Sequence, residues 1–175
     1  MREYLIAGFG GQGVLFTGKL ISNIALLKGQ HTTWMPSYGP EMRGGTCNCG
    51  VVVSDKLIGS PVVKEPDCLI ALNGPSCDKF ISKVRKGGTA YIDCAKVSGR
   101  YENDDIDSQY IPASDLLKKD GITDLANMVL LGKMIKDLDL ADLDTVKKAV
   151  EMSVSSDRVD LIESNIKALQ IGMGL

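Results

Sequence analysis

The sequence predicts an α/β fold built on an open, mixed but mostly parallel sheet, with helices on both faces and a helical C-terminal segment. Short apolar runs of strand length alternate with helical patterns through the first part of the chain, and a glycine-rich turn joins the first strand to the first helix. Beyond residue 121, apolar residues recur only at helical spacing. Alternation of this kind is typical of Rossmann-like domains, whose helices cover a largely parallel sheet.

The chain opens with a predicted strand over Glu3–Ala7 and a predicted helix over Val14–Lys28. Between them, Gly8, Gly10 and Gly13 have GxGxxG spacing. Glycines suit such a turn because it requires positive φ and lets a ligand approach the backbone closely. The unpaired N–H groups of the helix N-terminus and its partial positive charge favour an anion, with phosphate as the natural ligand.

A dinucleotide site requires more than this turn. In dinucleotide-binding folds, an acidic residue about 20 residues further on holds the ribose hydroxyls. The corresponding stretch, His31–Ser37, contains no carboxylate, and the chain has no GxxxxGK[ST] motif. A structural role or a different anion is therefore favoured for the turn. A stand-alone oxidoreductase of the NAD or flavin type is kept as an alternative, which a dinucleotide titration of the isolated chain tests.

The expected sheet continues with further strands and one intervening helix. A loop without a helix joins the second strand to the third, so these two are expected to pair antiparallel and to make the sheet mixed. The further strands are expected over His31–Ser37, Thr46–Ser54, Cys68–Leu72, Thr89–Asp93 and Gln109–Ile111, and the helix over Pro75–Val84.

The C-terminal segment is expected to form three helices that cover the sheet. The candidate N-cap residues are Thr123 or Asp124, then Asp142 or Asp144, and finally Asp157. The first helix carries an apolar stripe at helical spacing, which predicts core packing. The residues of this stripe are Met128, Leu131, Met134, Ile135 and Leu138.

Length and composition indicate a single domain over 1–175. The chain has 175 residues, 44% of them hydrophobic, and no segment resembling a linker. Its net charge of −2, with both signs mixed, does not provide the basic surface that nucleic-acid binding requires. The first apolar run has only four residues, too few for a signal peptide, and no run approaches the roughly 20 residues of a membrane span. We expect a cytoplasmic protein with neither nucleic acid nor membrane as a partner.

The cysteines are expected to be reduced thiols, because their number is odd and their spacings are irregular. They are Cys47, Cys49, Cys68, Cys77 and Cys94. Neither the spacing of an iron–sulfur motif nor paired zinc ligands is present, so no metal site is expected on this chain. Cys47 and Cys49 lie two residues apart on a predicted strand and share a face with Val51 and Val53, which predicts core packing.

Three loops are expected to converge where ligands bind in open α/β sheets, at the carboxyl ends of the strands. These loops are 8–13, 37–45 and 73–76. The middle loop carries Tyr38, Pro40, Glu41, Met42 and Arg43 between glycines, which indicates a rigid loop with one acid and one base available. The alternative is an ordinary connection with solvated charges.

No complete catalytic set accompanies these loops. The nucleophile motif GxSxG is absent, and the single histidine, His31, begins a predicted strand far from any serine motif. We interpret His31 as a surface or edge residue. The chain is therefore expected to have no catalytic residue of its own and to complete a site on another subunit.

Four segments carry a resemblance to a known family. They are GFGGQGVLFTGKLI at 8–21, MPSYGPEMRGGTCNCGVVVSD at 35–55, GSPVV at 59–63 and NMVLLGKM at 127–134. In this order, and over nearly the whole chain, they resemble the gamma subunit of 2-oxoacid:ferredoxin oxidoreductases. The YGPEMRGGT string is more specific than the glycine turn and is similar to the 2-oxoglutarate type, in which alanine is common at the position of Cys47. Enzymes for branched-chain 2-oxoacids or pyruvate are the alternatives.

The resemblance implies a complex of anaerobic metabolism that oxidatively decarboxylates a 2-oxoacid with coenzyme A and passes electrons to ferredoxin. For 2-oxoglutarate, the products are succinyl-CoA and carbon dioxide. Thiamine diphosphate and magnesium are implied on the alpha and beta subunits, and iron–sulfur clusters on beta or on a ferredoxin-like delta subunit. This chain is implied to bind none of these alone, to dock on alpha and beta, and to help form the coenzyme A side of the site.

The loops and the resemblance together give the candidate site residues. Those expected to be cofactor-binding or to face the active site are Gly10, Gly11, Gln12, Gly13, Tyr38, Glu41, Arg43, Gly44 and Asn73. Arg43 is the candidate for a phosphate or carboxylate group. A purely structural or assembly subunit is the alternative. The isolated chain is expected to be inactive and to form a homodimer through its apolar docking face.

Overall fold

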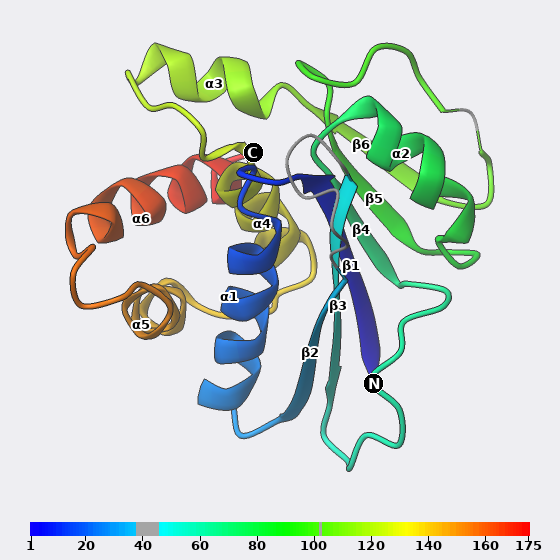
Figure 1. Cartoon of the computed structure of the whole chain (residues 1–175), viewed down its shortest axis with the longest axis horizontal. Coiled ribbons are helices and arrows are strands. Elements are labelled where there is room, and N and C mark those ends of the chain that lie inside the picture. Colours follow the sequence, from blue (N-terminus) through cyan, green and yellow to red (C-terminus); the bar gives the residue numbers. More distant parts are fainter. Residues whose placement is uncertain (38–45, 102) are drawn as a thin grey trace.

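The structure is a computed structural model that describes residues 1–37, 46–101 and 103–175. They form a six-stranded sheet in the order β2-β3-β1-β4-β5-β6, with helices on both faces (Figure 1). Strands β1, β4, β5 and β6 pair parallel, whereas β3 pairs antiparallel with both β1 and β2. The predicted mixed, mostly parallel α/β sheet is confirmed, including the antiparallel pairing of the second and third strands.

The elements follow the order that the sequence predicts. The strands are β1 (Arg2–Phe9), β2 (His31–Ser37), β3 (Thr46–Ser54), β4 (Cys68–Ala71), β5 (Thr89–Asp93) and β6 (Asp107–Ile111). The helices are α1 (Val14–Leu27), α2 (Gly74–Phe80) with a 3-10 turn η1 (Ile81–Lys83), α3 (Ala113–Lys119), α4 (Ala126–Asp137), α5 (Leu143–Ser153) and α6 (Asp160–Met173). Of these, α3 was not predicted.

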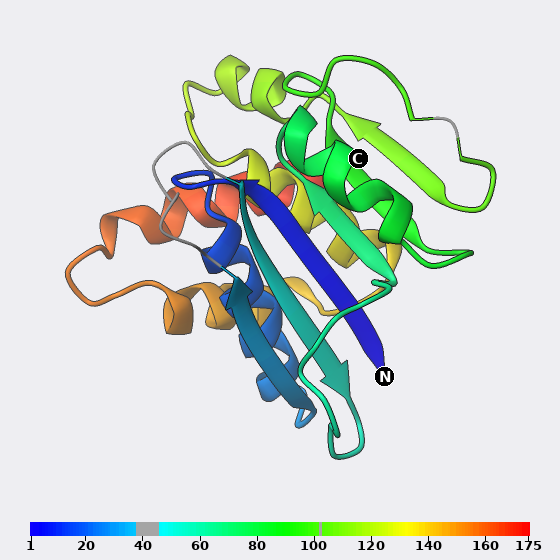
Figure 2. The ribbon, with the colours of Figure 1, turned by 45° about the vertical axis from the view of Figure 1, so that its right-hand side comes forward.

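Alternate residues of β1 supply two separate cores. Tyr4 and Ile6 point to the face covered by α1 and α4, whereas Leu5 and Ala7 point to the face covered by α2. Figure 2 shows the short helix α2 on one side of the strands and the longer helices α1, α4, α5 and α6 on the opposite side. Strands β4 and β5 alternate in the same way, so the two cores lie on opposite faces of the sheet and hold the loop after β1 from both sides.

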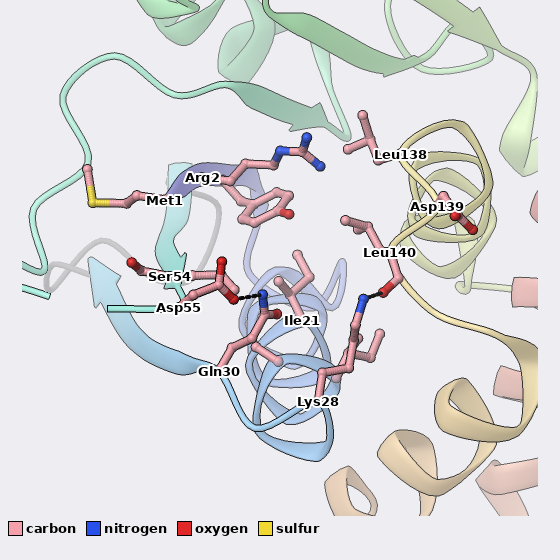
Figure 3. Close-up of a pocket in the computed structure, with 14 residues that line it drawn as sticks. Met1, Arg2, Ile21, Lys28, Gln30, Ser54, Asp55, Leu138, Asp139 and Leu140 are labelled. Atoms are coloured by element: carbon pink, nitrogen blue, oxygen red, sulfur yellow. Dashed lines mark hydrogen bonds between the residues drawn. The ribbon is translucent and has the colours of Figure 1, made fainter. Parts of the chain in front are cut away.

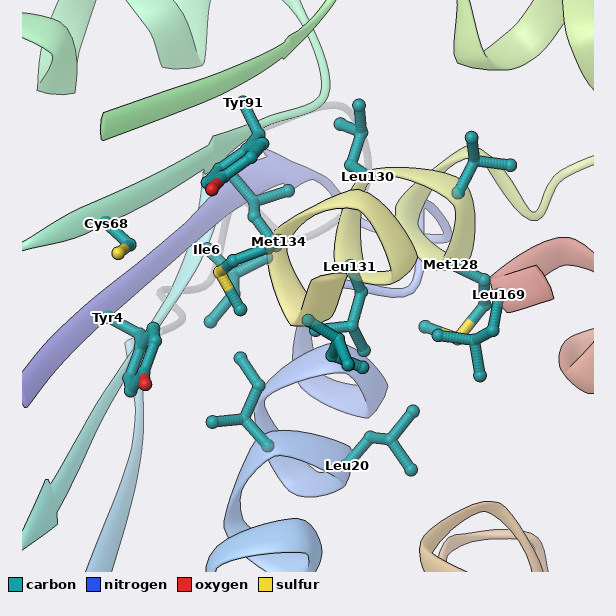
Figure 4. Packing of buried hydrophobic residues seen from close by; sticks show 14 of the residues in the cluster. Tyr4, Ile6, Leu20, Cys68, Tyr91, Met128, Leu130, Leu131, Met134 and Leu169 are labelled. Atoms are coloured by element: carbon teal, nitrogen blue, oxygen red, sulfur yellow. The ribbon is translucent and has the colours of Figure 1, made fainter. Parts of the chain in front are cut away.

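The larger core lies under α1 and α4 and includes Leu20, Met128, Leu131 and Met134 (Figure 4). Each of these side chains is fully buried, which contributes on the order of 1.5–3 kcal/mol per residue. The apolar stripe predicted for the first C-terminal helix, α4, is confirmed, and Leu138 at the end of the stripe is partly buried. Cys47 and Cys49 face the same core, as predicted.

Helices α4 and α6 cross so closely that two glycines are required. A Cβ atom added at Gly132 would lie 2.1 Å from the carbonyl oxygen of Leu169. One added at Gly172 would lie 2.0 Å from the carbonyl oxygen of Val129. The two backbones therefore touch directly, which fixes α6 against α4.

Two of the predicted helix caps are wrong. Asp124 has φ of 62° and precedes the N-cap position of α4, which Leu125 occupies without a side-chain hydrogen bond. Helix α6 begins at Asp160, and a hydrogen bond from Ser155 instead lowers the pKa of Asp157. For α5 the prediction is confirmed, because the Asp142 carboxylate accepts a hydrogen bond from the Thr145 N–H.

No helix among the described residues has the length and apolarity needed to cross a bilayer.

Candidate functional site

The candidate site lies where two parallel neighbours, β1 and β4, end side by side. The helix after β1 covers one face of the sheet, and the helix after β4 covers the other. The chain therefore leaves the two strands toward opposite faces of the sheet. In open α/β sheets this topological switch point is where ligands bind.

The glycine turn after β1 is shaped by two glycines with positive φ. These are Gly11, with φ of 93°, and Gly13, with φ of 74°. Gly13 is the N-cap residue of α1, and no described side chain caps this helix. Gly10 and Gly11 are exposed. The first-turn N–H groups of α1 are consequently available to an anion that approaches the exposed turn.

Gln12 and Asn73 tie the turn to the loop after β4. Gln12 Oε1 accepts hydrogen bonds from the Phe9 N–H at 2.6 Å and from Asn73 Nδ2 at 2.8 Å. Gln12 Nε2 donates to the carbonyl oxygen of Leu72 at 3.1 Å. Asn73 Oδ1 also caps α2 by accepting from the Ser76 N–H. The two loops thus converge, and both side-chain amides are engaged within the chain.

Asn127, in the first turn of α4, holds the other side of the turn. Its Nδ2 donates to the carbonyl oxygen of Gly13 at 3.3 Å and to Thr17 Oγ1 at 3.0 Å. Thr17 in turn donates to the same Gly13 carbonyl. A Cβ at Gly13 would lie 2.2 Å from Asn127 Nδ2, so glycine is needed both for its φ and for this contact.

Two cavities lie on either side of the turn. The first, here the α3 cavity, has a volume of about 160 Å³ and includes Gln12, Asp93, Lys96, Ser114 and Lys118 in its wall. The second, here the α6 cavity, has a volume of about 310 Å³ and includes Phe16, Arg158 and Asn165. Gly11, Asp124 and Asn127 line both. An elongated ligand held at the turn therefore has space in two directions.

A buried carboxylate forms part of the α3 cavity. Asp93, at the end of β5, accepts hydrogen bonds from Ser114 Oγ at 2.6 Å and from the Ala95 N–H at 3.2 Å. These bonds fix the start of α3 against the strand ends. The charge of Asp93 opposes that of Lys96, so this cavity has mixed rather than purely positive charge.

Several predicted residues lie outside the described residues. These are Tyr38, Glu41, Arg43 and Gly44. The described ends of their loop lie at the same sheet edge as the glycine turn, because Ser37 and Ala7 both pair with Asn48, and Thr46 pairs with Phe9. The strand ends that bear the three predicted loops therefore lie together.

Four of the five cysteines, Cys47, Cys49, Cys68 and Cys77, are buried. Burial raises the pKa of Cys49 and Cys68 to about 12 and that of Cys77 to about 11, so these groups are protonated near neutral pH. No group of three or more potential metal ligands occurs among the described histidine, cysteine and acidic residues.

A further cavity, of about 300 Å³, lies near the opposite end of β1 (Figure 3). Two hydrogen bonds cross its rim, from Lys28 Nζ to the carbonyl oxygen of Leu140 and from Gln30 Nε2 to Asp55 Oδ1. Arg2 and Asp139 add one charge of each sign. These contacts join α1 to the end of α4 and to the end of β3, so this cavity lies apart from the switch point.

Sequence reasoning missed Asn127, Asp93, Ser114 and Arg158. Asn127 opens the NMVLLGKM segment that carries part of the resemblance, which is the signal that singles it out. The pairing of Asp93 with Ser114 depends on α3, an element that was not predicted. Arg158 directly follows Asp157, which was wrongly predicted as the cap of α6. It lines the same cavity as Phe16 of α1, a position that depends on how the start of α6 packs.

Comparison with known proteins identifies the family to which the chain is similar. Residues 3–175 match the family described as pyruvate ferredoxin/flavodoxin oxidoreductase. Ketoisovalerate oxidoreductase subunit VorA of Methanothermobacter thermautotrophicus is 40% identical over 169 residues, which cover 95% of this chain and 35% of that protein. The chain thus spans about a third of the length of the VorA relatives it matches.

Two other proteins match along their whole length. The 2-oxoglutarate synthase subunit KorC of Methanothermobacter marburgensis is 34% identical over 181 residues, covering 99% of this chain and 96% of that protein. The gamma subunit of a keto/oxoacid ferredoxin oxidoreductase from Geobacter sulfurreducens has a TM-score of 0.83 and 28% identity, covering 99% of this chain and 97% of that one.

Proposed function

Because the chain belongs to the pyruvate ferredoxin/flavodoxin oxidoreductase family, we propose that it is the gamma subunit of a coenzyme A-dependent 2-oxoacid:ferredoxin oxidoreductase. The observation that carries this proposal is the end-to-end match with the KorC subunit, a chain of similar length. The solved gamma subunit from Geobacter sulfurreducens supports it with the same fold over nearly the same length.

Two substrates compete within this proposal. The match to KorC along its whole length favours 2-oxoglutarate, with succinyl-CoA as the product. The higher identity to VorA favours ketoisovalerate, a branched-chain 2-oxoacid. Substrate selection would reside on the partner subunits.

The role of this chain would be to bind coenzyme A at the glycine turn. The available N–H groups at the start of α1 suit the pyrophosphate, and the two cavities give space for its two arms. The buried and unpaired Oδ1 of Asn127 provides an acceptor that no described residue uses. Arg43 and its loop would complete the thiol end of the site beside the partner subunits.

The remaining chemistry would belong to the partners. Thiamine diphosphate with magnesium on the alpha and beta subunits would supply the decarboxylation chemistry, and iron–sulfur clusters there or on a ferredoxin-like delta subunit would pass electrons to ferredoxin. This division fits a chain in which the thiols of Cys49, Cys68 and Cys77 are buried and protonated. The isolated chain would then be inactive.

Anaerobic purification of the native complex tests the proposal. We expect partner subunits to co-purify and to reduce ferredoxin in a reaction that requires coenzyme A and either 2-oxoglutarate or ketoisovalerate. Preference for pyruvate would keep the class and change the substrate. An inactive lone chain that binds a dinucleotide would contradict the proposal and support the stand-alone oxidoreductase.

Replacing Arg43 in the assembled complex distinguishes a role of its loop in coenzyme A binding from a role in assembly of the subunits. If the loop contacts coenzyme A, Arg43→Ala raises the KM for coenzyme A while the yield of complex stays constant. Reduced yield with an unchanged KM would instead indicate an assembly subunit.

A further inference from the structure

The cavity near the opposite end of β1, here the Arg2 cavity, has an apolar floor. Helix α1 supplies Ile21, Ile24 and Ala25, which recur at helical spacing and therefore lie on one face of the helix. Leu138 and Leu140, which follow α4, line the cavity as well (Figure 3). With a volume of about 300 Å³, this space can enclose a small molecule that carries an aliphatic group.

A cation and a hydroxyl lie together in the β1 wall of the Arg2 cavity. Arg2 and Tyr4 are two residues apart on the strand, so their side chains point to the same face of the sheet. Burial raises the pKa of Tyr4 to about 12, and the charge of Arg2 beside it opposes this rise. The hydroxyl therefore stays neutral and can donate a hydrogen bond next to a fixed positive charge. A carboxylate suits such a pair of donors.

A carboxylate of the chain lies at another part of the wall. Asp55 directly follows β3, and its Oδ1 accepts a hydrogen bond from Gln30 Nε2 at 2.8 Å. In Figure 3 Asp55 lies beside Gln30, below the guanidinium of Arg2. Among the described residues, neither Asp55 nor Arg2 forms an ion pair. Both charges are thus available to a ligand, and they are opposite in sign.

The other charged side chains of the wall are placed less favourably for a ligand. The Lys28 ammonium donates to the carbonyl oxygen of Leu140, so it is already engaged within the chain. Asp139 is exposed and lies at the outer side of the cavity in Figure 3. A molecule on the apolar floor therefore meets Arg2 and Asp55 first.

One cation, one anion and an aliphatic floor narrow the class of ligand. A fatty acid would place its carboxylate at Arg2 and leave Asp55 without a partner, whereas an alkyl amine would leave Arg2 without one. A phosphate would be attracted by Arg2 and repelled by Asp55. A zwitterion with an apolar side chain satisfies both charges and the floor.

We propose that the Arg2 cavity binds an α-amino acid with an aliphatic side chain. Its carboxylate would pair with Arg2 and accept a hydrogen bond from Tyr4. Its ammonium would pair with Asp55, and its side chain would pack against Ile21 and Ile24. This inference goes beyond the proposed function, because the ligand is neither a substrate nor a cofactor of the proposed reaction.

The test is calorimetric titration of the full 175-residue chain with leucine and two analogues. The analogue 4-methylpentanoate lacks the ammonium, and leucinamide lacks the carboxylate charge. We expect leucine to bind about tenfold more tightly than either analogue, because each analogue loses one charge-assisted contact. Equal binding of 4-methylpentanoate and leucine would overturn the proposal, as would the absence of leucine binding.

Two variants that each remove one charge connect the ligand groups to their side chains. Arg2→Gln should weaken leucine binding about tenfold without weakening the binding of leucinamide. Asp55→Asn should weaken leucine binding to a similar degree without weakening the binding of 4-methylpentanoate. Variants that weaken all three ligands equally would show that these side chains do not contact the charged groups, and the assignment would be wrong.

Asp107→Asn is the matched control for Asp55→Asn. Asp107 is likewise an exposed acid at a strand end, and its Oδ2 accepts a hydrogen bond from Gln109 Nε2 at 2.8 Å, but it does not line the Arg2 cavity. Asparagine keeps an acceptor for the glutamine amide at both positions, so both variants should retain the wild-type Tm.

The control and the Tm values separate ligand recognition from folding. Leucine binding should be unchanged in Asp107→Asn. An equal loss of binding in both variants, or a loss in Asp55→Asn accompanied by a lower Tm, would count against the proposal. None of these results bears on the proposed function, which the assay of the native complex tests separately.

Discussion

Helix α4 makes two close contacts that differ in chemistry. Near its middle, Gly132 meets the backbone of α6 with no space between them. At its start, the Asn127 side chain meets the backbone of Gly13, with a cavity on each side. Its Oδ1 has no partner among the described residues. The first contact gains packing and leaves no room for a ligand. The second keeps space beside the glycine turn at the expense of an unsatisfied acceptor.

The difference shows how one helix serves both stability and binding. Glycine inside a helix costs about 0.5–1 kcal/mol relative to alanine, so Gly132 and Gly172 are retained for the approach that they permit. Buried polar groups in folded proteins usually have partners, so the Asn127 oxygen, which has none among the described residues, points to a contact beyond those residues. Substitutions at the two contacts should therefore differ in what they change.

The largest effect is expected at the crossing of α4 and α6. Gly132→Val should destabilise the protein by about 3 kcal/mol or more, because the carbonyl of Leu169 occupies the space of its Cβ. Chemical denaturation measures the change. Gly59→Val is the matched control, since no atom lies within 4 Å of a Cβ at that glycine. Equal stability of the two variants would mean that the backbones do not meet as described.

A smaller effect is expected at the glycine turn. Gly13→Ala combines the cost of positive φ, about 1–2 kcal/mol, with the contact of its Cβ on Asn127 Nδ2. Gly11→Ala isolates the φ cost, because nothing lies within 4 Å of a Cβ there. Adding Asn127→Ala to Gly13→Ala should recover roughly 1 kcal/mol of unfolding free energy in a double-mutant cycle. Strict additivity would contradict the contact.

The smallest effect is expected at α5, away from both contacts. The hydrogen bond from the Thr145 N–H lowers the pKa of Asp142 below its usual 3.8. Its stabilisation is therefore present above pH 3.8 and is lost as the pH falls through the lowered folded-state pKa. Asp142→Ala should lower the Tm slightly at pH 7 and by less under acid conditions. A Tm difference that grew towards low pH would contradict the cap.

The sequence predicts the parts of this fold that depend on local pattern. The strand over Thr89–Asp93 is a short apolar run, and the helix after the glycine turn is an apolar segment of helical length. The rule that loops meet at strand ends anticipates the contact between Gln12 and Asn73. The contact between Asn127 and Gly13 joins positions 114 residues apart, and no local signal marks it. Asp124 shows the limit of cap prediction, because its positive φ moves the start of α4 beyond it.

The crossing of α4 and α6 also has a mechanical consequence. Because the two helices touch backbone to backbone at Gly132 and Gly172, they form one stiff body. Asn127 lies on one of these helices and Asn165 on the other, so the two side chains keep a fixed spacing. The glycine turn belongs to the loop after β1 and lies outside this body. The hydrogen bond from Asn127 to the Gly13 carbonyl oxygen ties the turn to this stiff pair, so the position of one side of the turn depends on a crossing made far from it.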